Sequence, residues 1–146
     1  MKNLIITAMA IFTFGITQAQ EWYLDLSEAK SVAVEQDKTI LMVFEGSDWC
    51  IPCMKLNKLI FSTDEFREYA KDHYVMLKVD FPKRKQNRLS EEQQKKNNKL
   101  AEDYNKEGYF PFVVLLDKNG KTLGETGYKN ISVKEYIGEL EALLKK

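Results

Sequence analysis

The residues most able to do chemistry are two cysteines, which stand three positions apart in the run Trp49-Cys50-Ile51-Pro52-Cys53. A continuous apolar run precedes them, and apolar residues at roughly helical spacing follow, so the pair is expected where a strand turns into a helix. The unpaired N–H groups and partial positive charge of a helix start favour a thiolate over a thiol. We therefore expect Cys50 to have a lowered pKa and to act as a nucleophile.

Cys53 comes one helical turn after Cys50 on the same face, where it can attack a mixed disulfide that Cys50 forms with a substrate. Pro52 suits the first turn of a helix, because the N–H that it lacks has no partner there. Ile51 adds an apolar surface beside the nucleophile. This spacing favours a dithiol that exchanges disulfides with other molecules.

Three other interpretations of the cysteines are weaker. A structural zinc site needs four ligands, and the chain adds only His73 to the two cysteines, so no metal is expected. A structural disulfide between neighbours this close would stabilise the fold little. An inert reduced pair is disfavoured in an oxidising compartment. No cofactor is expected.

Residues 1–19 have the pattern of a secretory signal peptide, with Lys2, an apolar run over 4–16, and small residues at Thr17 and Ala19. The run is shorter than the roughly 20 apolar residues that cross a membrane. We predict cleavage after Ala19 and export, most simply to the periplasm of a Gram-negative-type bacterium and otherwise by secretion. An uncleaved anchor is the alternative.

The remaining segment, 20–146, has the length of one ordinary domain. Its charge is nearly balanced, since the whole chain carries 22 Lys and Arg against 22 Asp and Glu. Such a balance provides no general attraction to nucleic acid or anionic lipid, and we expect a monomer that binds neither.

Strands and helices are expected to alternate along the chain and to end in a hairpin and a last helix. The expected strands cover residues 22–26, 39–44, 74–79, 112–116 and 122–125. The expected helices begin at a Ser27 cap, at the cysteines, at 62–65, at a Ser90-Gln93 capping box and at a Ser132-Glu135 capping box. This order predicts an α/β fold, with a central mixed β-sheet flanked by helices on both faces.

The motif Trp-Cys-x-Pro-Cys after a buried strand, with a proline opening a later strand, resembles the thioredoxin superfamily. The resemblance covers the chain from about Thr39 onwards and implies a thioredoxin-like fold. It also implies that Cys50 is an exposed nucleophile, that Cys53 is the buried resolving cysteine and that Trp49 flanks the site. The implied activity is exchange with protein thiols and disulfides through a Cys50-Cys53 redox disulfide.

The same resemblance implies a cis peptide bond before Pro111, opposite the cysteines. The backbone of Phe110 would then pair with an extended substrate chain, as in strand addition. An ordinary trans proline at a strand start is the alternative.

Two departures from the family pattern concern charged residues. The family's buried aspartate on the strand before the motif corresponds to Phe44, and the neighbouring Glu45 is a weak proton-shuttle candidate that should point to the other face. Asp48 is most simply a solvated turn residue, with local tuning of the site as the alternative. The long polar segment 81–105 is most simply a solvated face, with a docking surface for a partner as the alternative.

We therefore expect an exported thiol/disulfide oxidoreductase, with a reductant favoured over an oxidant because relatives with proline before the second cysteine are often reductants. A reductant in an oxidising compartment needs a donor, so a membrane partner that supplies electrons is expected. The alternative is a peptide-binding or partner-binding module of the same fold, in which the disulfide is passive.

Overall fold

The computed structural model describes residues 20–145, so the expected signal peptide over 1–19 lies outside the described part. The strands are β1 (Trp22–Tyr23), β2 (Thr39–Glu45), β3 (Tyr74–Asp80), β4 (Phe112–Leu116) and β5 (Thr122–Thr126). They form a single mixed sheet in the order β1-β3-β2-β4-β5. β1, β3 and β2 run parallel, and β4 and β5 are antiparallel to their neighbours.

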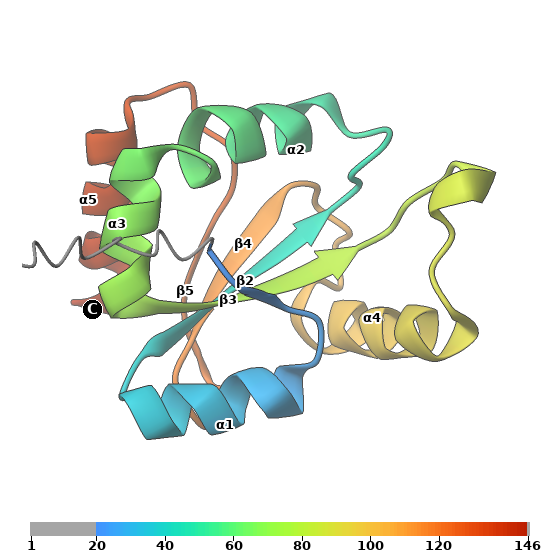
Figure 1. Cartoon of the computed structure of the whole chain (residues 1–146), viewed down its shortest axis with the longest axis horizontal. Coiled ribbons are helices and arrows are strands. Elements are labelled where there is room, and N and C mark those ends of the chain that lie inside the picture. The colour runs from blue at the N-terminus through green and yellow to red at the C-terminus, as the bar shows by residue number, and fades with distance from the viewer. Residues whose placement is uncertain (1–19, 146) are drawn as a thin grey trace, which may run out of the picture.

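Helices cover both faces of this sheet (Figure 1). They are α1 (Leu26–Gln36), α2 (Ile51–Leu56), α3 (Asp64–His73), α4 (Glu91–Tyr104) and α5 (Val133–Leu144), with a π-helical turn over Asn57–Phe61 and a 3-10 turn over Lys85–Asn87. α1 and α4 lie on one face, and α2, α3 and α5 lie on the other. The predicted mixed sheet between two helical layers is confirmed. No helix within residues 20–145 is long and apolar enough to cross a bilayer.

β2 is the central strand and is buried on both faces, as its unbroken apolar run predicts. Its side chains alternate: Met42 and Phe44 pack toward α1 and α4, whereas Leu41 and Val43 pack toward α2, α3 and α5. Each fully buried side chain of this size contributes roughly 1.5–3 kcal/mol. The loop that leaves the end of β2 is therefore anchored to the best-packed part of the molecule.

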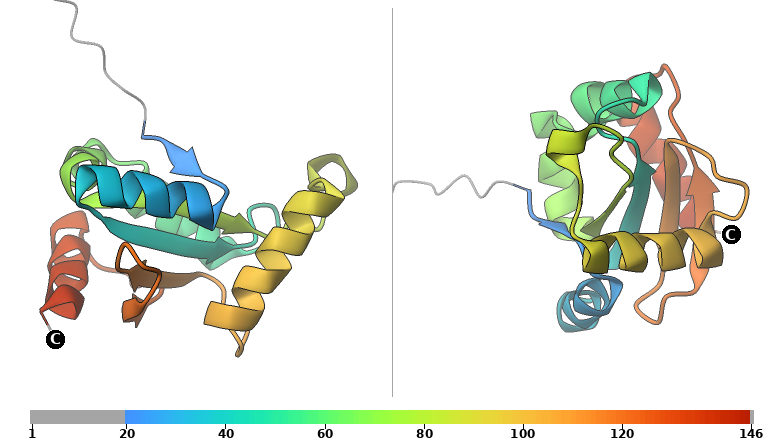
Figure 2. Two further views of the ribbon diagram at one scale, coloured as in Figure 1. Left: turned by 90° about the horizontal axis from the view of Figure 1, so that it is seen from below. Right: turned by 90° about the vertical axis from the view of Figure 1, so that its right-hand side faces the viewer.

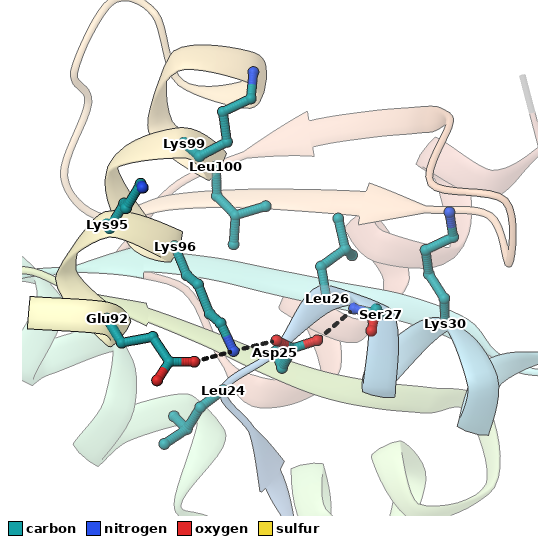
Figure 3. A pocket seen from close by; sticks show the side chains of 10 residues that line it. All are labelled: Leu24, Asp25, Leu26, Ser27, Lys30, Glu92, Lys95, Lys96, Lys99 and Leu100. Atoms are coloured by element: carbon teal, nitrogen blue, oxygen red, sulfur yellow. Dashed lines mark hydrogen bonds and ion pairs between the residues drawn. The ribbon is translucent and has the colours of Figure 1, made fainter. Parts of the chain in front are cut away.

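The expected Ser27 cap is wrong, because Asp25 caps α1. One carboxylate oxygen of Asp25 accepts hydrogen bonds from the amides of Ser27 at 2.8 Å and Glu28 at 3.2 Å. The other accepts one from Lys96 Nζ of α4 at 2.9 Å (Figure 3). Lys96 and these amides lower the pKa of Asp25 to about 2. The helix thus begins at Leu26, and β1 is shorter than expected.

The expected capping box of α4 forms only in part. Ser90 Oγ accepts a hydrogen bond from the Gln93 amide at 3.2 Å, but the Gln93 side chain donates to the Leu24 carbonyl at 2.9 Å. Asn97 is buried and donates to the Asp80 carbonyl at 2.9 Å. Polar contacts of this kind explain how a helix with a sparse apolar stripe stays docked on the sheet.

Candidate active site

Cys50 and Cys53 form a disulfide at the start of α2, with their Cα atoms 5.2 Å apart. Cys50 is the N-cap of the helix, and the Cys53 amide donates a hydrogen bond to Cys50 Sγ at 3.2 Å. Pro52 occupies the first turn, as expected. The predicted position of the pair, where a strand gives way to a helix, is confirmed, and the nucleophile candidate lies where the helix presents its unpaired N–H groups.

The expected exposure of Cys50 is wrong for this disulfide form. Cys50 is 4% exposed and Cys53 is 3% exposed, so the two are buried to the same degree. Each sulfur is covered on one side by its bonded partner. The residues around them remain accessible, with Trp49 36% and Ile51 65% exposed, so a protein substrate can reach the rim of the site.

The turn between β2 and α2 is shaped around the indole ring of Trp49. The amides of Trp49 and Cys50 donate to the Gly46 carbonyl at 3.2 and 2.9 Å. A Cβ at position 46 would overlap the indole ring, so this close approach requires glycine. The backbone that carries Cys50 is therefore held through both its hydrogen bonds and its packing.

Three aromatic residues join the three loops that surround the disulfide. Trp49 Nε1 donates to the Phe81 carbonyl at 2.7 Å. The Phe110 ring lies with its centroid 5.4 Å from that of Trp49 and 5.6 Å from that of Phe81. Edge-to-face pairs at such distances stabilise an arrangement beyond simple burial. Sequence reasoning missed Phe81, because nothing in its local pattern distinguishes it from an ordinary residue after a strand.

The peptide bond between Phe110 and Pro111 is cis, as the family resemblance implies. Beside it an open groove of about 650 Å³ extends from Pro52 toward β5. Its wall includes the exposed Tyr109 and the carboxylate-bearing Glu125. The groove begins at the helix that carries the cysteines and can accept an extended chain.

Asp48 does not behave as the solvated turn residue expected from the sequence. Its carboxylate accepts hydrogen bonds from the amides of Lys83 and Arg84 and from Asn87 Nδ2, each at 2.9 Å. These donors, the Lys83 amide foremost, hold the pKa of Asp48 below its usual value. Asp48 therefore clamps the loop after β3 against the turn that precedes Cys50. Its partners lie 35 to 39 residues away, beyond the reach of any local motif.

Further contacts reinforce this junction. Asp80 accepts from the Ser47 amide at 2.9 Å and from Ser47 Oγ at 2.6 Å, and the Phe81 amide donates to the Glu45 carbonyl at 2.9 Å. The ammonium of Lys83 lies 4.0 Å from the centroid of the Trp49 ring, within cation–π range.

Glu45 points to the face opposite Phe44, as expected from the alternation of side chains along the strand. Phe44 belongs to the cluster on the α1 and α4 side, so alternation places Glu45 on the opposite face, where Val43 packs with residues of α2. Glu45 is 6% exposed and forms a salt bridge of 3.5 Å with Lys78. Burial raises the pKa of the Glu45 carboxyl, and the Lys78 charge opposes part of that rise. The buried carboxyl is thus on the face that carries the cysteines.

A separate groove of about 540 Å³ lies between the start of α1 and α4 (Figure 3). Its lining combines the apolar side chains of Leu24, Leu26 and Leu100 with those of four lysines, Lys30, Lys95, Lys96 and Lys99. No residue of α2 lines it, whereas Pro52, which stands between the two cysteines, lines the groove beside Pro111, so that groove is the one next to the disulfide. Among residues 20–145, no group of three or more His, Cys, Asp or Glu side chains is arranged to hold a metal ion.

Comparison with known proteins relates this geometry to one family. A family model described as thioredoxin-like matches residues 21–118. The disulfide bond reductase DsbH of Chlamydia pneumoniae is 35% identical over 119 residues, which cover 82% of this chain and 70% of the relative. A solved structure of a DsbH oxidoreductase superposes with a TM-score of 0.80 at 32% identity, over 95% of both chains. The expected thioredoxin-like fold is therefore confirmed.

A second relative is matched over a smaller part of its length. The thioredoxin-related protein DsbJ of Chlamydia pneumoniae is 28% identical over 106 residues. These cover 73% of this chain but only 30% of DsbJ. The chain therefore spans less than a third of the length of DsbJ.

Replacing Asp48 with alanine is expected to release the loop from Lys83 to Arg88, because three hydrogen bonds to one carboxylate are lost. The loop is rich in trypsin sites, so limited trypsinolysis should cut there severalfold faster than in the unmodified protein. Asp72→Ala, which removes an exposed carboxylate from α3, is the matched control. Equal cleavage of Asp48→Ala and the unmodified chain would show that Asp48 does not hold the loop.

Proposed function

Because the chain belongs to the thioredoxin-like family and is a thiol-disulfide oxidoreductase, we propose that it reduces disulfides in exported proteins. The observation that carries this proposal is the Cys50-Cys53 disulfide at the N-cap of α2, beside the groove at Pro111. The similarity to a protein named as a disulfide bond reductase supports the reducing direction.

In the reduced form, Cys50 is the proposed nucleophile. The N–H of Cys53 points at its sulfur, and the partial positive charge of the helix start favours the anion, so its pKa falls below the usual value of about 8.5. The thiolate attacks one sulfur of a substrate disulfide. A Cys50-substrate bond forms, the substrate S–S bond breaks, and the departing sulfur leaves as a thiolate that takes a proton from water.

Cys53 then resolves this mixed disulfide. Its thiol loses a proton, and the resulting thiolate attacks Cys50 Sγ, which forms the Cys50-Cys53 bond and releases the second substrate sulfur. Two electrons pass from the protein to the substrate. A dithiol donor must return them for the next cycle, and a membrane protein is the proposed donor.

The substrate is proposed to lie along the groove as an extended chain. Phe110, just before the cis bond, would offer its backbone N–H and C=O to that chain as an added strand does. The exposed Ile51 and Trp49 provide apolar surface beside the disulfide, and Pro111 shapes the wall across from it. Recognition through the backbone is compatible with many different protein substrates.

Export is proposed from the sequence of residues 1–19, with cleavage after Ala19 and the periplasm as the destination. Residues 20–146 then form the working domain. The partners proposed are thiols and disulfides of exported proteins, with neither nucleic acid nor lipid among them, and the protein is proposed to act as a monomer.

The direction of exchange is tested by the reduction potential of the Cys50-Cys53 couple. Equilibration with a dithiothreitol buffer should give a value near that of thioredoxin, about −270 mV, because a reductant must hold its electrons at low potential. A value near −120 mV, which is typical of a strong oxidant, would contradict the reducing role.

The roles of the two cysteines are tested by trapping. Cys53→Ala is expected to accumulate covalent mixed disulfides with exported proteins, because the resolving thiol is absent. Cys50→Ala, the matched control, should accumulate none. Non-reducing electrophoresis and mass spectrometry would identify the adducts. If neither variant traps a partner, the alternative of a binding module with a passive disulfide is favoured.

We further propose that Glu45 accepts the proton of Cys53 during resolution. Glu45→Gln should slow that step near neutral pH, and the deficit should shrink as pH rises, because Cys53 then ionises without help. Stopped-flow measurement of mixed-disulfide decay across pH tests this proposal. Alkylation of Cys50 should be unchanged.

A matched variant separates proton transfer from damage to the fold. Lys78 opposes the rise in the Glu45 pKa, so Lys78→Met should raise that pKa further and shift the resolution profile to higher pH. Burial raises the pKa of Glu45, so the free energy of unfolding decreases as pH rises and the carboxyl ionises in the folded protein. Glu45→Gln removes this ionisation and should not lower the thermal stability at pH 7. An unaltered pH profile in both variants would exclude the role of Glu45.

A further inference from the structure

We propose that the loop 82–88 is a positively charged recognition surface that selects substrates with acidic residues near the disulfide to be reduced. This inference rests on the proposed function, because it names the substrate chemistry of the same site. The proposed disulfide exchange at the cysteines and the proposed backbone binding in the groove at Pro111 do not depend on acidic residues in the substrate.

The loop concentrates positive charge in an otherwise balanced protein. Four of its seven residues are basic and none is acidic, while the chain as a whole has a formal net charge of zero. The four basic residues are Lys83, Arg84, Lys85 and Arg88, and all are exposed. Among residues 20–145, none of these four side chains takes part in a salt bridge. Their charge is therefore available to a partner.

The loop is also held in place rather than left to sample many positions. Asp48 accepts its three hydrogen bonds from Lys83, Arg84 and Asn87 of the loop, and the Lys83 ammonium lies 4.0 Å from the centre of the Trp49 ring. Phe81, at its entry, is bonded to Trp49 Nε1. Asp48 offsets only one of the four positive charges. The loop is thus an ordered surface of net positive charge, and it contacts Trp49, the residue before Cys50.

This position places the charge within reach of a bound substrate. The loop projects at the end of the molecule opposite α3 and α5 (Figures 1 and 2). Exposed charges interact over about 10 Å at 0.1 M salt, so acidic side chains a few residues from the attacked disulfide would be attracted. Across the site, the groove at Pro111 carries a carboxylate, Glu125. The attraction is therefore confined to one side of the site.

The size of the surface favours an acidic protein segment over other polyanions. Nucleic acid and anionic membranes are bound by many cations over an extended face, whereas this loop presents four beside the redox centre. Charges at the rim of an interface act chiefly on the association rate and its salt dependence. The expected consequence is faster capture of acidic substrates.

The test uses three peptides with the same disulfide and with Glu, Gln or Lys at the same flanking positions. Reduction of each by the reduced protein is followed by stopped flow at about 0.02 M and about 0.5 M salt. The Glu peptide should react roughly tenfold faster than the Lys peptide at low salt, and the difference should fall below about twofold at high salt.

The charge is removed with the triple variant Arg84→Gln, Lys85→Gln and Arg88→Gln, which leaves the backbone amides bonded to Asp48. A matched control neutralises three exposed lysines on or beside α3 and α5, with the substitutions K71Q, K134Q and K145Q. The loop variant should lose most of the preference for the Glu peptide, and the control should keep it.

The two proposals fail in distinguishable ways. Rapid reduction of all three peptides at equal rates, or an equal loss of preference in the loop variant and the control, would overturn selection by the loop and leave the reductase intact. Salt-sensitive binding to anionic vesicles without peptide discrimination would also overturn it. Failure to reduce the Gln peptide at all would instead contradict the proposed function. The uncharged reagent dithiodipyridine should react with both triple variants at the unmodified rate.

Discussion

The hydrogen bond from the Cys53 amide to Cys50 Sγ is the interaction on which the chemistry of this protein depends. It exists because β2 ends one short turn before α2, so that Cys50 caps the helix with its sulfur. The Cys53 N–H, which would otherwise be unpaired in the first turn of the helix, would stabilise a Cys50 thiolate when the disulfide is reduced. Structural capping and the proposed activation of Cys50 thus depend on one contact, and Pro52 leaves it undisturbed by occupying the first turn.

Trp49 connects this helix start to the rest of the site. Its ring fills the space that Gly46 leaves open, its Nε1 donates to the Phe81 carbonyl in the loop after β3, and its ring forms an edge-to-face pair with that of Phe110. Asp48 binds the same loop through three further donors. The two residues before Cys50 therefore bring together segments that lie more than thirty residues apart in the chain, and they define both the apolar rim and the charged rim of the site.

The cysteine pair, the order of strands and helices, and the cis bond before Pro111 were all accessible from the sequence. Each rests on a local pattern or on a specific family motif. The cap at Asp25, the half-formed box at Ser90 and the burial of Glu45 beside Lys78 were not. In each case a distant group decided the outcome, such as Lys96 bonding Asp25 or the Leu24 carbonyl capturing the Gln93 side chain.

Apolar periodicity and residue spacing act over a few neighbouring positions, so the residues alone indicate a dithiol at the start of a helix on a mixed sheet. Which loops surround that dithiol becomes visible only in the folded chain. The hydrogen bonds of Asp48, the hydrogen bond from Trp49 to the Phe81 carbonyl and the contact of Lys83 with the Trp49 ring all join residues that no local pattern relates. Such contacts form only when the sheet brings the ends of its strands together, so the surroundings of the cysteines are a property of the folded chain.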